Sequence, residues 1–93
     1  MSYYNINNLA FSNHALSRAS QRIKSCRGLD EVDLIIKLKE IFQRSQFDFE
    51  DNQYYYFAIE KRTGLYFIID KFENLVVSIT NISYAKKIEL LSK

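Results

Sequence analysis

Residues 53–82 read QYYYFAIEKRTGLYFIIDKFENLVVSITNI, three runs rich in aromatic and β-branched side chains. Their apolar side chains alternate with a period of two, which predicts three strands at 53–61, 64–70 and 74–82. Gly64 and Asn74 end the short connections between the runs, and both residue types tolerate the left-handed backbone of three-residue hairpin loops. We therefore expect a three-stranded antiparallel meander.

The two loops also predict how the strands pair. The expected partners are Phe57 with Ile69, Ile59 with Phe67, Phe67 with Ile79, and Ile69 with Val77. One face of the meander is then wholly apolar, and a slip of one residue would move every side chain to the other face. The opposite face carries Tyr54, Tyr56, Tyr66 and Val76.

Upstream of these strands the apolar spacing changes to that of helices. Ser12 or Asn13 can cap a first helix, whose buried stripe holds Leu16, Ala19, Ile23 and Cys26 and which we expect to end at Gly28. A second helix over 31–45 begins after Asp30, and Leu29 and Leu34 have the spacing of a hydrophobic staple. We expect residues 48–52 to form a polar loop and residues 1–10 a short strand or an ordered arm.

A short C-terminal helix is predicted after Ser83, with Tyr84, Ile88 and Leu91 on the side that closes one edge of the tyrosine-rich face. The fold class is therefore α+β, with two N-terminal helices packed on a three-stranded antiparallel meander and a short C-terminal helix. A chain of 93 residues has room for one domain, which we expect to span 1–93.

Composition excludes several classes of protein. The single Cys26 and single His14 rule out a disulfide framework and the usual zinc sites, and glycine is too scarce for a phosphate-binding loop. No run of about 18 apolar residues suggests a membrane span, and the first residues lack the pattern of a signal peptide. We expect a cytoplasmic protein with no cofactor, no metal ion and no membrane association, in which Cys26 is a core residue.

Charge is unevenly distributed along the chain. Residues 1–28 carry four bases and no acid, whereas residues 29–52 carry seven acids and three bases. An acid-free segment of this kind favours a surface for phosphate or for an acidic partner. The alternative is that acids of the second segment fold over and pair with these bases. Residues 47–51, which alternate Phe with Asp and Glu, are a candidate docking strip for a basic partner or a plain acidic loop.

His14, Arg18 and Arg22 follow one another at intervals of four residues, so a helix places them in one line beside the buried stripe. Arginine binds phosphate oxygens in a planar fork, and histidine can move a proton near neutral pH. The line therefore suits a phosphodiester. It is equally typical of a solvated helix flank whose side chains bond to backbone carbonyls or to acids of the second helix.

The string H-A-x2-R-x3-R-I formed by His14, Ala15, Arg18, Arg22 and Ile23 resembles the first helix of small bacterial and phage toxins related to RelE and BrnT. The order of elements and the strand at 75–80, LVVSIT, are similar too. This resemblance implies a metal-independent endoribonuclease fold, often a toxin held by a partner protein. The further helix after the last strand departs from that pattern.

For such an enzyme, His14 would act as base or acid, and Arg18 and Arg22 would clamp the phosphate. Candidate RNA-binding residues, by base stacking or phosphate contact, are Tyr54, Tyr56, Tyr66, Lys61 and Arg62. Tyrosines at alternate strand positions are also typical packing residues, and basic hairpin tips are commonly just solvated.

Two other functions remain open on the sequence. The chain has the size and composition of a non-enzymatic phage-type regulator or inhibitor that binds a host protein, and the arginines could also hold a nucleotide without cutting it. Candidate partners are therefore RNA, an antitoxin or a host protein, and a second copy of the chain in a homodimer.

Overall fold

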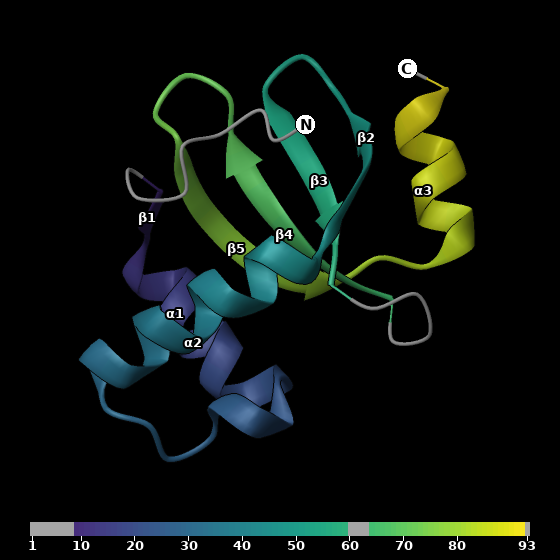
Figure 1. Cartoon of the computed structure of the whole chain (residues 1–93). Helices are drawn as coiled ribbons and strands as arrows, with labels where there is room; N and C mark the ends of the chain where they lie inside the picture. Colours follow the sequence, from purple (N-terminus) through teal and green to yellow (C-terminus); the bar gives the residue numbers. More distant parts are fainter. Residues whose placement is uncertain (1–8, 60–63, 93) are drawn as a thin grey trace.

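The computed structural model describes residues 9–59 and 64–92, and in this part of the chain three α-helices accompany a five-stranded mixed sheet (Figure 1). The strands follow the spatial order β1-β5-β4-β3-β2. The elements are β1 Ala10–Phe11, α1 Asn13–Arg22, α2 Glu31–Arg44, β2 Gln46–Glu50, β3 Tyr54–Ala58, β4 Leu65–Asp70, β5 Leu75–Asn81 and α3 Tyr84–Leu91.

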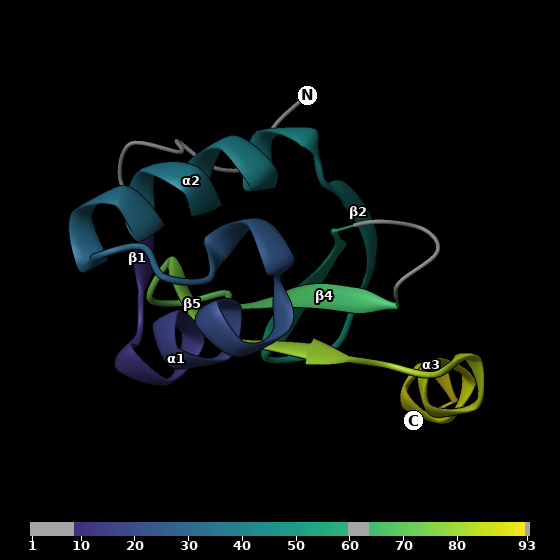
Figure 2. The ribbon, with the colours of Figure 1, turned by 90° about the horizontal axis from the view of Figure 1, so that it is seen from below.

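The two faces of the sheet are covered differently. Helix α2 lies over one face, α1 packs against β5, and α3 lies on the side of the sheet opposite α2 (Figure 2). The main core lies under α1 and α2, where Phe67, Ile69 and Ile79 of the sheet are fully buried with Leu38 of α2. Phe42 of α2 adds edge-on and tilted ring contacts with the sheet, an arrangement that aromatic quadrupoles favour. The α+β class is thus confirmed.

The expected three-stranded meander is incomplete, because two strands flank it. Residues 46–50 form β2, antiparallel to β3, and residues 10–11 form β1, parallel to β5. The polar loop predicted at 48–52 is therefore wrong in its first half. The alternation of Phe47 and Phe49 with acids is the period-two pattern of a strand, and Phe49 is indeed buried.

Of the four predicted strand pairs, one is present and three are not, since the β3 partner of Phe67 is Phe57 rather than Ile59. Phe67 lies opposite Ile79 as expected, but Phe57 lies opposite Phe67 rather than Ile69, a shift of two residues that keeps the same face inward. The partner of Ile69 is Val76, not Val77, because the register changes between Ile68 and Ile69.

This irregularity reverses the inward face of β5. Val76 is fully buried in the main core, whereas Val77 is half-buried. The extra residue of a β-bulge changes which side chains point inward beyond it, and strict alternation cannot reveal its position. The predicted place of Val76 on the tyrosine-rich face is therefore wrong.

The helix starts are confirmed and the first helix end is not. Ser12 caps α1 and Asp30 caps α2, each accepting a backbone N–H three residues ahead. Helix α1 ends at Arg22 rather than near Gly28, because the chain becomes extended at Ile23 and then forms a 3₁₀ turn at Lys24–Cys26. Helix α2 ends at Arg44, one residue before the predicted Ser45.

Helix α3 begins after its Ser83 cap as predicted, yet it presents a different side to the sheet. Tyr84, Ile88 and Leu91 are exposed. Lys87 and Leu90 instead contact the sheet, Lys87 by an ion pair and Leu90 by apolar packing. The ion pair with Asp48 of β2 therefore holds the Lys87 side of α3 against the sheet.

Candidate functional site

Helix α1 starts directly on β5. The Ser12 hydroxyl accepts the N–H of Ala15 at 3.0 Å and donates to the carbonyl of Val77 at 3.0 Å, while the Ser12 N–H bonds to the carbonyl of Val76. One serine thus caps the helix and joins it to the sheet. Ala15, Leu16 and Ala19 are buried against the sheet, which leaves the opposite side of α1 to the solvent.

His14, Arg18 and Arg22, which we call the basic ridge, follow one flank of α1 beside its buried side. The Arg18 Nε donates to His14 Nε2 over 3.5 Å, and its Nη1 donates to Gln21 Oε1 at 3.2 Å. His14 is exposed and Arg18 half-buried. The imidazole and the first guanidinium therefore lie side by side at the surface, as the four-residue spacing predicts.

The third member of the ridge reaches the sheet. Arg22 Nη1 donates to Thr80 Oγ1 at 2.9 Å. Thr80 pairs directly with Tyr66 across β5 and β4, so both side chains belong to the face opposite α2. Arg22 thus places one guanidinium beside the tyrosine-rich face, while most of its five N–H donors remain available.

The acids of residues 29–52 do not neutralise the ridge. Within residues 9–59 and 64–92, the ion pairs are Lys37–Glu40, Lys71–Glu50, Lys86–Glu89 and Lys87–Asp48. None of these pairs includes a ridge residue, so in that part of the chain the predicted pairing with folded-over acids does not occur. Among the described residues, the ridge therefore carries positive charge that no carboxylate pairs with.

Two of the tyrosines predicted to bind RNA lie inside a second aromatic cluster, formed by Phe49, Tyr56, Tyr66 and Ile82 on the α3 side of the sheet. Tyr56 is 5% exposed and stacks on Phe49, with ring centroids 4.3 Å apart. Tyr66 is 8% exposed and meets the same ring edge-on. Neither ring offers a free face to a base, so packing within the protein accounts for both residues. Tyr54, the third candidate, is half-buried.

Asp48 joins the second cluster to α3. Its carboxylate accepts the Tyr66 hydroxyl at 2.6 Å and pairs with Lys87 at 2.8 Å. Partial burial alone would raise the pKa of Asp48, but the hydrogen bonds from Lys87 and Tyr66 and the Lys87 charge outweigh it and hold that pKa below 3.8. Burial and the Asp48 carboxylate raise the pKa of Tyr66 to about 12.

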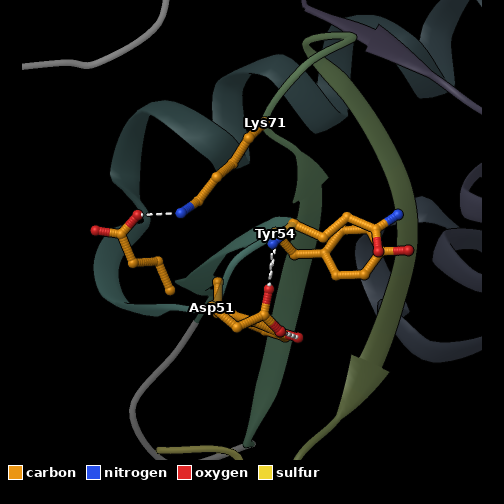
Figure 3. A network of polar contacts seen from close by, with 6 residues as sticks. Asp51, Tyr54 and Lys71 are labelled. Carbon is orange, nitrogen blue, oxygen red and sulfur yellow. Dashed lines mark hydrogen bonds and ion pairs between the residues drawn. The ribbon is translucent and has the colours of Figure 1, made fainter. Parts of the chain in front are cut away.

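Asp51 is held by three donors at the turn between β2 and β3. Its Oδ1 accepts the N–H groups of Gln53 at 2.8 Å and Tyr54 at 2.7 Å, and its Oδ2 accepts the Tyr56 hydroxyl at 2.7 Å (Figure 3). Burial alone would raise the pKa of Asp51, but these bonds and the nearby Lys71 charge lower it, so the carboxylate is ionised near neutral pH. Burial, together with Asp51, raises the pKa of Tyr56.

The roles of Asp48 and Asp51 as partners of the tyrosines were not predicted from the sequence. The available signal was the alternation of Phe47, Asp48 and Phe49, which puts Asp48 on the other side of the strand from both phenylalanines unless the strand is irregular. The pairing of β2 with β3 does shift between Phe47 and Phe49. The irregularity in β2 therefore allows the side chains of Asp48 and Phe49 to lie on the same face of the sheet, the face that α3 covers.

Other candidates have simpler placements. Cys26 is fully buried, which raises the pKa of its thiol and fits the predicted core role. Lys61 and Arg62 lie outside the described residues. In the described part of the chain, no group of three or more His, Cys, Asp or Glu residues could hold a metal ion, and no helix has the length and apolar character to cross a membrane.

Comparison of the chain with protein-family models, curated protein sequences and solved structures gave no match. The resemblance to RelE and BrnT toxins therefore stays a prediction that rests on the His14 to Ile23 motif and the order of elements.

Proposed function

We propose that the chain binds the phosphate backbone of RNA through the basic ridge. The observation that carries this proposal is the absence, among the described residues, of a carboxylate paired with His14, Arg18 or Arg22. Guanidinium groups with several unused donors bind phosphate oxygens by charge-assisted, forked hydrogen bonds. RNA, rather than another phosphate ligand, is favoured by the imidazole at the end of the ridge and by the toxin-like motif.

Cleavage is the finer part of the proposal. His14 Nε2 exchanges the Arg18 N–H for a ribose 2′-OH and takes the proton of that hydroxyl, the oxygen attacks the adjacent phosphorus, and the bond to the 5′ oxygen of the next nucleotide breaks. The products are a 2′,3′-cyclic phosphate and a free 5′-OH, which receives its proton from water. Arg18 and Arg22 stabilise the negative charge on the phosphorus oxygens in the transition state.

Binding is tested by fluorescence anisotropy with a labelled single-stranded RNA over a range of salt concentrations. We expect Arg18→Gln and Arg22→Gln each to weaken binding about tenfold and to reduce the salt dependence by about one phosphate contact. Lys86→Gln is the matched control, because Lys86 is an exposed cation on α3. Equal losses in all three variants would indicate diffuse attraction rather than a site on α1.

Cleavage is tested separately with a structured RNA in EDTA. His14→Gln is expected to abolish cutting while the anisotropy signal persists, since the phosphate contacts remain. If the unmodified chain binds RNA without cutting it, the binding proposal stands and the cleavage proposal is wrong.

A second candidate function, a non-enzymatic regulator that binds a host protein, is favoured by one observation. Tyr84, Ile88 and Leu91 are 77%, 45% and 53% exposed and lie along one side of α3. Grouped apolar side chains of this kind are typical of interaction surfaces. Co-purification of a cellular protein that depends on these residues would support this function.

A further inference from the structure

A surface hollow of about 560 Å³ lies between the turn joining β2 to β3 and the end of α3. Its volume falls within the range of about 300–1,000 Å³ typical of ligand sites. The β2–β3 turn and Lys71 contribute its charged groups, and the end of α3 contributes apolar side chains. The lining includes Glu50, Asp51, Tyr54, Lys71, Leu90 and Leu91.

The charged groups of the hollow carry one negative charge in excess. Lys71 forms an ion pair with Glu50 (Figure 3). Its ammonium also lies 5.0 Å from the centroid of the Tyr55 ring. Asp51, in contrast, is ionised and accepts only neutral donors, and within the described residues no cation lies at ion-pair distance from it. Three of its roughly four acceptor positions are used, which leaves room for one more donor.

The apolar groups of the hollow suit the methylene part of a long side chain. Leu91 is 53% exposed, while Leu90 and Tyr54 are half-buried. Arginine and lysine lay their methylene stems along apolar surfaces and keep the charged head among acceptors. A guanidinium or ammonium near Asp51 would also meet the Tyr54 ring, and aromatic rings attract cations.

We propose that this hollow binds an arginine or lysine side chain presented by a segment of a partner protein. A segment fits better than a free amine because Leu91 belongs to the exposed side of α3 with Tyr84 and Ile88, so a flanking apolar residue of the partner would cover it. RNA is disfavoured, since its phosphates would meet the Glu50 and Asp51 carboxylates. The hollow is lined by the β2–β3 turn, Lys71 and the end of α3, none of which belongs to the basic ridge.

The test uses two peptides, acetyl-Gly-Leu-Arg-Leu-Gly-amide and the same peptide with neutral citrulline in place of arginine, titrated by calorimetry or by NMR shifts. We expect the arginine peptide to bind at least five times more tightly than the citrulline peptide. Asp51→Asn should remove this preference, because an amide oxygen still accepts the Gln53 and Tyr54 N–H groups while the charge is lost. Leu91→Ala should weaken both peptides.

Glu73→Gln is the matched control, since it removes an exposed carboxylate at the turn between β4 and β5 and should leave binding unchanged. Leu91→Ala keeps the test decisive if Asp51→Asn unfolds, which circular dichroism reports. Equal binding of the two peptides would overturn the proposal. So would self-association that requires Asp51 and Arg18 together, because the occupant would then be the basic ridge of a second copy.

Discussion

Replacement of Tyr66 by Phe removes one hydroxyl from the second aromatic cluster and changes little else. That hydroxyl donates to Asp48 at 2.6 Å, and the ring itself is 8% exposed. Phenylalanine keeps the ring contact with Phe49. The variant therefore isolates the hydrogen bond to the carboxylate that also holds Lys87 of α3.

The expected loss is about 1–2 kcal/mol of unfolding free energy at pH 7. A hydrogen bond to a charged group contributes about 1.5–3 kcal/mol, and the lower end applies because Asp48 keeps its ion pair with Lys87 and a side chain that is 26% exposed. The rise of the Tyr66 pKa from 10.0 to about 12 reflects burial and the Asp48 carboxylate, which disfavour the ionised tyrosine, so it bears on stability above pH 10 rather than at pH 7. For a chain of this size the midpoint of thermal unfolding should fall by about 5–10 °C.

The assay is urea unfolding followed by circular dichroism, with Tyr84→Phe as the control because Tyr84 is 77% exposed. The difference between the unmodified chain and Tyr66→Phe should be constant from about pH 5 to 9. Above pH 10 the unfolded tyrosine loses its proton first, so the unmodified chain loses stability and the difference shrinks as the pH approaches about 12. Below about 3.8 the difference also shrinks, because the lowered pKa of Asp48 stabilises the fold only while the carboxylate is ionised.

Two results would refute this reasoning. One is a Tyr66→Phe variant that unfolds at the same urea concentration as Tyr84→Phe. The other is an undiminished effect of Tyr66→Phe in an Asp48→Asn background, where a double-mutant cycle should show a clear interaction between the two positions.

The remaining predictions concern the start of α1 and the irregularity in β5. Ser12→Ala removes both the cap of α1 and the bond to Val77, so we expect a loss of about 1–2 kcal/mol, measured by urea unfolding; an effect below about 0.5 kcal/mol would contradict this double role. Val76→Thr buries a hydroxyl in the main core and should cost about 1–3 kcal/mol, whereas Val77→Thr should cost much less. The reverse order in thermal unfolding would mean that β5 keeps strict alternation.

Local signals in the sequence were sufficient for the helices and the middle of the sheet. Ser12, Asp30 and Ser83 cap helices because their oxygens accept free N–H groups of the first turn, an interaction set by a few neighbouring residues. The strands β3, β4 and β5 were predicted from the alternation of apolar and polar side chains. The expected left-handed conformations at Gly64 and Asn74 are also present, with φ of +69° and +53°.

Features that depend on distant partners could not be predicted in this way. A short strand or an ordered arm was expected at residues 1–10, of which 1–8 lie outside the described residues. Strand β1 at Ala10–Phe11 is set by its pairing with β5 across the fold, which the sequence did not indicate. The inward side of α3 depends on Asp48, 39 residues before Lys87. Likewise, the spacing of His14 and Arg18 predicts their proximity on α1, but the reach of Arg22 to Thr80 requires α1 to pack against β5.

The arrangement of strands also affects whether molecules can add to one another through the edges of their sheets. Strands β1 and β2 form the two edges of the sheet in the described part of the chain, and β2, with five residues against two, is the longer edge open to a further strand. An open edge invites fibril-like stacking between molecules. Here the irregular step between Phe47 and Phe49 breaks the regular row of backbone donors and acceptors along β2. The irregularity therefore disfavours the addition of an identical strand at this edge.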